Sequence, residues 1–235
     1  RTLLSWVGGQ SGLLWGSPTP HNLPPEIDKE VAKIGYRTHG AYPSFFEQEL
    51  CYVLGQALDG VFSSDELSCR FGLNGKDPLD AAARVARAVT GRDPVASCGY
   101  HGAGESWVHP PYPLGIPQVY RDLSHRFEWG DVEKVWVQAA ICAAICVEVP
   151  ALDDEKSIAD FLCQCRLACD AGGAVFILDE TVTGFRLGLR GAAGRYLVKP
   201  DIATYGKCIS AAGCVSAIVG AAELVDYLDG RAFHS

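Results

Sequence analysis

Residues 174–207, AVFILDETVTGFRLGLRGAAGRYLVKPDIATYGK, contain two apolar runs that each end next to a charged side chain. The first run, residues 174–178, is continuous and rich in branched and aromatic residues, which is typical of a central parallel strand covered on both faces. It ends at Asp179. The second, residues 201–205, is less apolar, and it leads into Gly206 and Lys207. Because open α/β sheets bind ligands at the carboxyl ends of their strands, we expect Asp179 and Lys207 to face one site.

These two side chains suit the two ends of pyridoxal phosphate. The cofactor acts as an electron sink when its ring nitrogen is protonated, which requires a carboxylate, and when a lysine amine forms a Schiff base with it. Asp179 would be largely desolvated, and a facing pyridinium would offset the cost of burying its charge. We expect Gly206 to let the backbone turn sharply so that Lys207 points back across the sheet end. Either motif taken alone is more typical of a capped or solvated turn, so the prediction depends on the rest of the chain.

Composition limits the class of protein. The chain has 235 residues, of which 48% are hydrophobic and 20% charged, enough for one large α/β domain or two small ones. Its formal net charge of -8 argues against a sequence-independent nucleic-acid binder, which needs a basic surface. No apolar run reaches the roughly 20 residues that span a bilayer, and no signal peptide is evident, so we expect a cytoplasmic protein without a membrane segment.

Ten cysteines raise the question of disulfides or a metal. Eight of them lie in apolar or helical stretches, which is typical of small buried side chains in a reducing compartment. The group Cys163, Cys165 and Cys169 has no histidine or second cysteine pair nearby at zinc-ligand spacing, so we predict no metal. The chain contains no methionine and begins at Arg1, from which we expect a processed, engineered or incomplete piece of a longer protein.

Strand and helix patterns alternate along the chain. Residues 1–40 form an irregular partial N-terminal segment with one helical stretch, and residues 41–235 are expected to form the cofactor-binding large domain. The expected elements are helices over residues 44–58, 78–90 and 158–171, and strands over residues 94–98 and 144–149. This alternation predicts the α/β class, with a mostly parallel sheet sandwiched by helices.

Two segments between these elements suggest binding. Gly75 and Lys76 precede a helix whose N-terminus could hold a phosphate, but Asp77 is a candidate N-cap for the same amides, so an ordinary capped helix fits equally. Glycines on both sides of Tyr100 and His101 free the backbone, so that Tyr100 could lie flat over an aromatic ligand. Such stacking contributes about 0.5 to 1.5 kcal/mol. A turn with one aromatic packed on the core is the alternative.

These motifs, in order, resemble the class III pyridoxal-phosphate-dependent aminotransferases, and among them glutamate-1-semialdehyde aminomutase and its relatives. The resemblance extends from about Trp6 to Leu228 and implies the large domain of the fold-type I pyridoxal-phosphate enzymes. The segments that carry it are Asn74-Gly75-Lys76-Asp77, residues 81–93, Cys98-Gly99-Tyr100-His101-Gly102, residues 178–186, Lys199-Pro200-Asp201 and Gly206-Lys207.

The resemblance implies a role for each matched residue. Lys207 would form the Schiff base and act as the catalytic residue, and Asp179 would pair with the ring nitrogen. The other implied contacts are Gly75 and Lys76 at the phosphate, Tyr100 on one ring face with His101 beside it, Thr181 on the other face, and Ser5 with Trp6 in the substrate pocket.

The chain also departs from the family pattern. Lys76 stands where the family has Ser or Thr, and Glu148-Val149-Pro150 replaces a Glu-Pro step. Family members form homodimers with a shared active site, and they continue beyond the position of Ser235 with a phosphate-binding loop and a small C-terminal domain. We expect that domain to be absent here.

Two classes of function remain open. The first is an aminotransferase or aminomutase that moves an amino group between small donor and acceptor substrates through Lys207. The second is a non-catalytic cofactor-binding or structural remnant of the fold. A nicotinamide dehydrogenase fits poorly, because no G-x-G-x-x-G follows a strand near the start. Arg186 and Arg190 are candidate clamps for a substrate carboxylate, although solvated or structural arginines are more common after a strand.

Overall fold

The computed structural model describes residues 45–63, 67–102, 104–108, 114–150, 154–210 and 215–228. They build a seven-stranded sheet in the order β1-β7-β6-β5-β4-β2-β3. The strands are β1 (Leu67–Gly72), β2 (Val95–Cys98), β3 (Ser124–Arg126), β4 (Ala144–Glu148), β5 (Val175–Asp179), β6 (Ile202–Tyr205) and β7 (Ser216–Ala221). The predicted N-terminal helix and the candidate pocket residues Ser5 and Trp6 lie outside the described residues.

The sheet is mostly parallel. Strands β3, β2, β4, β5 and β6 pair in parallel, whereas β7 runs antiparallel to both β6 and β1. The predicted α/β fold class is therefore confirmed. Register aligns the carboxyl ends of three strands, because Glu148 pairs with Asp179 and Asp179 pairs with Thr204.

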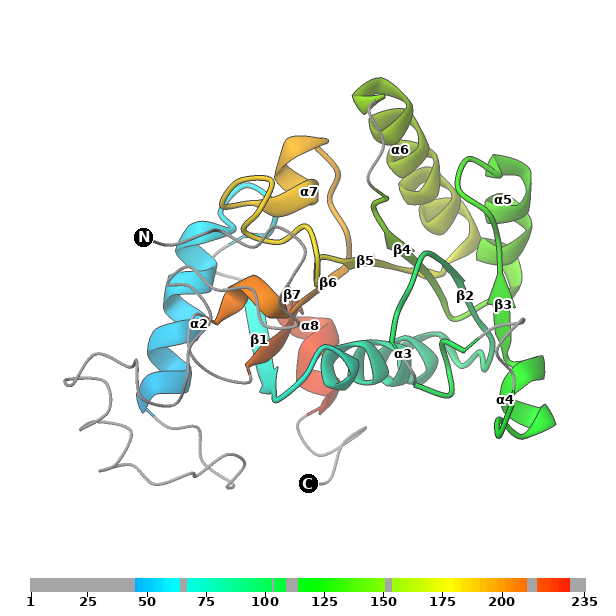
Figure 1. Cartoon of the computed structure of the whole chain (residues 1–235), viewed down its shortest axis with the longest axis horizontal. Coiled ribbons are helices and arrows are strands. Elements are labelled where there is room, and N and C mark those ends of the chain that lie inside the picture. Colours follow the sequence, from blue (N-terminus) through cyan, green and yellow to red (C-terminus); the bar gives the residue numbers. More distant parts are fainter. Residues whose placement is uncertain are drawn as a thin grey trace.

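Helices cover both faces of the sheet (Figure 1). On one face pack α2 (Phe45–Ala57), α5 (Val132–Ile141), α6 (Glu155–Gly172) and α7 (Gly191–Arg195), and on the other α3 (Lys76–Thr90) and α8 (Ala222–Val225). A short helix, α4 (Gln118–Asp122), precedes β3, and 3-10 turns occupy Lys207–Ile209 and Asp226–Leu228. Strand β5 shows why its sequence is continuously apolar: Phe176 and Leu178 contribute to one core cluster, and Val175 and Ile177 to the other.

The start of α3 differs from its prediction. The helix begins at Lys76 with Gly75 as its N-cap, and Asp77 does not cap it. The Asp77 carboxylate instead accepts the backbone N–H groups of Leu73 and Asn74, at 2.8 and 3.1 Å, in the turn before the helix. The predicted end is confirmed, because Gly91 adopts a left-handed φ of 68° and donates its N–H to Arg87 O.

Arg92 fastens the ends of two helices together. Its Nη1 donates to the carbonyls of Ala139 and Cys142, at 3.1 and 3.0 Å, at the end of α5. Its Nη2 donates to the carbonyl of Gly172, at 2.8 Å, at the end of α6. The guanidinium thus satisfies carbonyls that a helix leaves unpaired at its C-terminus.

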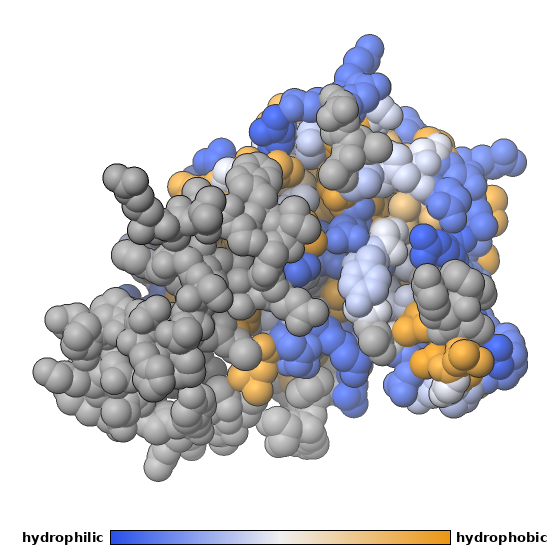
Figure 2. All heavy atoms as spheres, in the orientation of Figure 1, coloured by the Kyte–Doolittle hydropathy of each residue, from blue (hydrophilic) through white to orange (hydrophobic). Residues whose placement is uncertain are grey.

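The nine described cysteines are free thiols. Most are buried, as predicted, but Cys163 is exposed on α6, and Cys214 lies outside the described residues. On the face shown in Figure 2, hydrophilic side chains are interspersed with hydrophobic ones, as on an ordinary protein surface. None of the described helices combines the length and apolar character that crossing a membrane requires.

Candidate active site

Asp179 lies at the end of β5, buried to 1% exposure, between polar groups from neighbouring segments. Its Oδ1 accepts the backbone N–H of Thr181 at 3.0 Å and the hydroxyl of Thr204 at 3.2 Å. Its Oδ2 lies 2.8 Å from Nδ1 of His101. A carboxylate offers about four acceptor positions, so these three contacts leave room for one more donor.

His101 stabilises the negative charge of Asp179. Its Nε2 lies 3.0 Å from the carbonyl oxygen of Cys98, which can only accept, so Nε2 carries a hydrogen. Its Nδ1 faces the carboxylate, so the ring donates from both nitrogens and is an imidazolium.

The pKa shifts of the two groups agree with this assignment. Burial opposes the charged ring, but the neighbouring Cys146 and Asp179 outweigh it and raise the pKa of His101 well above 6.5. Burial likewise opposes the charged carboxylate, but the hydrogen bond and charge of His101 lower the pKa of Asp179 below its ordinary value of 3.8. Asp179 is therefore ionised at neutral pH, as a partner for a pyridinium must be.

Three small or short residues close the site from different elements. A Cβ atom at Gly75 would lie 3.2 Å from Cγ2 of Thr181, and a Cβ at Gly206 would lie 3.1 Å from the same methyl group. The turn before α3 and the ends of β5 and β6 thus meet at Thr181. The Thr181 hydroxyl is buried near Asp179 and helps to lower the pKa of that carboxyl, although it makes no hydrogen bond of normal geometry with the described residues.

Lys207 follows β6 and lies at the same sheet edge as Asp179, because β5 and β6 are parallel. The predicted turn at Gly206 is wrong in one respect: Gly206 is extended, with φ of -158°, and Lys207 itself is left-handed, with φ of 47°. A non-glycine residue in this region is uncommon, and such strain is concentrated at functional sites. Glycine is needed at 206 for close approach to Thr181.

Lys76 stands at the turn, but its side chain is engaged along its own helix. Its Nζ pairs with Asp80 Oδ2 at 3.1 Å, and this hydrogen bond and charge raise the pKa of Lys76. Its backbone N–H donates to Oδ1 of Asn74 at 2.9 Å. A phosphate at this turn would have to draw Lys76 away from Asp80.

Tyr100 is 73% exposed, so the residue is accessible to a ligand. Its backbone N–H donates to Oε2 of Glu148 at 2.7 Å. Glu148 is a site residue that the sequence interpretation missed. The structure ends β4 at Glu148 and pairs that residue with Asp179, which only the strand register could show.

The two candidate carboxylate clamps have structural contacts instead. Nη1 of Arg186 donates to Val182 O at 2.7 Å. The Arg190 guanidinium packs against Gly60, 3.5 Å from the position of a Cβ there. The alternative interpretation, structural arginines, therefore accounts for both.

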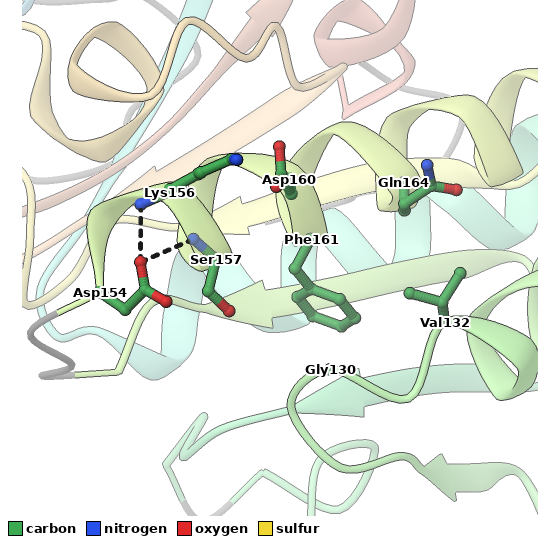
Figure 3. Close-up of a pocket in the computed structure, with 8 residues that line it drawn as sticks. All are labelled: Gly130, Val132, Asp154, Lys156, Ser157, Asp160, Phe161 and Gln164. Atoms are coloured by element: carbon green, nitrogen blue, oxygen red, sulfur yellow. Dashed lines mark hydrogen bonds between the residues drawn. The ribbon is translucent and has the colours of Figure 1, made fainter.

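A hollow of about 320 Å³ lies elsewhere, between the turn before α5 and the start of α6 (Figure 3). None of the candidate site residues lines it. Asp154 caps α6 there by accepting the N–H groups of Lys156 and Ser157, both at 3.2 Å, so these two amides are already paired. Among the described residues, no group of three or more His, Cys, Asp or Glu side chains is arranged to hold a metal ion.

Comparison with solved structures defines the class of fold. A transaminase with pyridoxal phosphate bound matches 90% of this chain and 54% of its own, with a TM-score of 0.70 and 24% identity. An omega-transaminase from Sphaerobacter thermophilus gives the same values. A glutamate-1-semialdehyde aminomutase from Pseudomonas aeruginosa matches at a TM-score of 0.66 and 18% identity over 90% of this chain and 49% of its own. The fold is thus shared with about half of each of these transaminase chains.

Sequence comparison finds relatives that carry the name of one particular enzyme. Proteins named glutamate-1-semialdehyde 2,1-aminomutase from Halorubrum lacusprofundi and Haloarcula marismortui are 30% and 29% identical over 95% of this chain. The predicted resemblance to the class III pyridoxal-phosphate-dependent aminotransferases, and to glutamate-1-semialdehyde aminomutase among them, is confirmed. The chain spans about half the length of these relatives, 52% in both cases. No family model matches the chain.

Proposed function

We propose that this chain is the cofactor-binding large domain, residues 41–235, of a pyridoxal-phosphate-dependent aminotransferase or aminomutase. The observation that carries the proposal is the ionised, buried Asp179, which has one acceptor position left and lies at the same sheet edge as Lys207. The relatives' names support the same chemistry.

The residues present fit the cofactor. Asp179 would accept a hydrogen bond from the ring nitrogen and keep a proton there, and His101 would keep Asp179 ionised. The remaining contacts would be Gly75 and Lys76 at the phosphate, Tyr100 on one ring face and Thr181 on the other. The buried Thr181 hydroxyl and the close approach at Gly206 are the features that a bound group would use.

When bound, pyridoxal phosphate supplies a ring that stabilises negative charge on the carbon next to the transferred amine. Lys207 would hold the cofactor through its amine and then move the proton at that carbon.

A second candidate, a cofactor-binding or structural relative without turnover, is favoured by the altered phosphate turn. Lys76 is paired with Asp80, and its amide with Asn74, so the turn is less open to a phosphate than free amides would be. The enzyme remains the better-supported function, because the Asp179 and Lys207 arrangement has its own chemistry.

For the whole protein, we propose a cytoplasmic homodimer with a shared active site, which acts on small amino donors and acceptors and not on nucleic acid or membranes. The nine free thiols support a reducing compartment, and the net charge of -8 argues against nucleic acid. The dimer rests on the family resemblance. One structural neighbour, a taurine:2-oxoglutarate aminotransferase, was solved in complex with pyridoxal phosphate and glutamate, which illustrates the class of substrate.

The test is reduction of the protein with borohydride after incubation with pyridoxal phosphate. The cofactor should become fixed to one peptide, which contains Lys207, and the Lys207→Ala variant should lose the label. Lys199→Ala is the matched control, because Lys199 is exposed and precedes the same strand at its other end. Labelling of Lys207→Ala at the wild-type level would refute the assignment. An amino donor should convert the bound cofactor in the enzyme but not in a remnant.

A further inference from the structure

Glu148 ends β4 and pairs in the sheet with Asp179, so the two carboxylates lie side by side at the candidate site. Glu148 is only partly exposed, whereas the side chain of the neighbouring Tyr100 is mostly in solvent. The contact between them runs from the Glu148 side chain to the Tyr100 backbone.

The contact is a close one between the Glu148 side chain and the Gly99–Tyr100 backbone. Oε2 accepts the Tyr100 N–H at 2.7 Å, a short hydrogen bond. A Cβ atom at Gly99 would lie 2.6 Å from Cβ of Glu148, and Gly99 has a φ of 106°, so only glycine fits there. The backbone therefore lies directly on Glu148.

The neighbouring residue is held from the other side. His101 is fixed by Asp179 and by the Cys98 carbonyl, at 2.8 and 3.0 Å. Tyr100 thus lies between two attachments, one to each carboxylate. Tyr100 itself is 73% exposed, so these attachments of the backbone on both sides of it are what hold it in place.

We propose that Glu148 is a positioning residue that fixes the backbone of Tyr100, so that the exposed ring stands over the ligand site. This role rests on the cofactor site proposed above. It requires a hydrogen-bond acceptor at position 148 and not a negative charge. Burial also raises the pKa of Glu148, and a protonated carboxyl keeps its carbonyl oxygen as an acceptor.

The first test needs no cofactor. Hydrogen exchange at the Tyr100 amide should be about 2- to 10-fold faster in Glu148→Ala, which corresponds to the loss of one ordinary hydrogen bond. Glu148→Gln keeps an acceptor, so its Tyr100 amide should exchange at the wild-type rate. Glu133→Ala, an exposed change on α5, should leave the exchange unaltered. Slow exchange in Glu148→Ala would overturn the proposal.

The second test is a double-mutant cycle on affinity for pyridoxal phosphate, with Tyr100→Ala as the partner variant. Glu148→Ala should weaken binding several-fold in the wild type but add almost nothing to Tyr100→Ala, while Glu148→Gln should bind like the wild type. Equal losses in both backgrounds, or a Glu148→Gln loss as large as that of alanine, would overturn the positioning role. Failure of the wild type itself to bind the cofactor would instead refute the proposed function and with it the role of the ring.

Discussion

His101 and Asp179 form a buried ion pair, with 2.8 Å between Nδ1 and Oδ2, although 78 residues separate them in the chain. The second ring nitrogen of His101 is bound to the Cys98 carbonyl, so the imidazolium has a partner on both sides. A buried charge with no partner costs several kcal/mol. Here each side chain is the partner of the other's charge before any ligand binds. The site is thus electrostatically organised by the chain itself.

Removing one member of this pair should be costly. His101→Leu leaves Asp179 as an uncompensated buried charge and should lower the free energy of unfolding by about 3 to 5 kcal/mol. Urea unfolding at neutral pH measures the loss. In the control, Asp179→Leu combined with His101→Leu, the cost should be smaller than the sum of the two single changes, because no buried charge remains. Additive costs would show that the two side chains do not interact.

The same pair predicts how stability depends on pH. The lowered pKa of Asp179 contributes stability that is present above its ordinary value of 3.8 and is lost as pH falls through the folded-state value. The raised pKa of His101 contributes stability that is present below 6.5 and is lost as pH rises through its folded-state value. Unfolding free energies measured over a pH series should therefore show the full stabilisation by the His101–Asp179 pair between pH 3.8 and pH 6.5. A His101→Leu variant should lack the alkaline loss, and a variant that retains it would contradict the assignment.

Arg92 gives a prediction about the scaffold. Arg92→Ala leaves three carbonyls at the ends of α5 and α6 without their donor, and should lower the free energy of unfolding by about 2 to 3 kcal/mol. Arg126→Ala, which removes an exposed pair with Glu128, should change it by less than about 1 kcal/mol. Urea unfolding compares the two variants. Equal effects would mean that Arg92 does not join the helices.

The sequence predicted the parts of the fold that local patterns determine. The run over residues 174–178 indicated a strand buried on both faces, and β5 has that environment because its alternate residues enter different core clusters. The prediction that Asp77 caps α3 was wrong, because the direction of a short polar side chain depends on the turn around it. The Asp77 carboxylate accepts instead from the backbone N–H groups of Leu73 and Asn74.

The candidate site was predicted in its residues more than in its contacts. Asp179 and Lys207 follow neighbouring parallel strands, so their common edge could be inferred from the fold class. The bond between His101 and Asp179 could not, since it depends on how the segment after β2 crosses the sheet end. Glu148 was missed because an acidic residue at the end of a strand has no meaning until the register places it beside Asp179.

Lys76 should contribute to phosphate binding in competition with Asp80. Asp80→Asn removes the partner of Lys76 and should tighten the binding of pyridoxal phosphate several-fold, most clearly at low salt. Lys76→Ala should weaken binding and reduce its salt dependence. Titration of absorbance at two ionic strengths measures both effects. Weaker binding in Asp80→Asn would show that Asp80 supports the turn and does not compete for Lys76.

The contact between Gly206 and Thr181 can be tested by adding a methyl group at position 206 and removing the methyl group of Thr181. Gly206 is extended, so alanine is allowed there by the backbone, and the obstacle is the 3.1 Å approach of its Cβ to Cγ2 of Thr181. Gly206→Ala should therefore cost about 1 to 3 kcal/mol in unfolding free energy, the usual range for overpacking. Thr181→Ser removes the opposing methyl group and should relieve most of this cost in the double variant. If Gly206→Ala costs the same in both backgrounds, the requirement for glycine at 206 does not come from Thr181. The interpretation that the turn before α3, β5 and β6 pack closely around Thr181 would then be refuted.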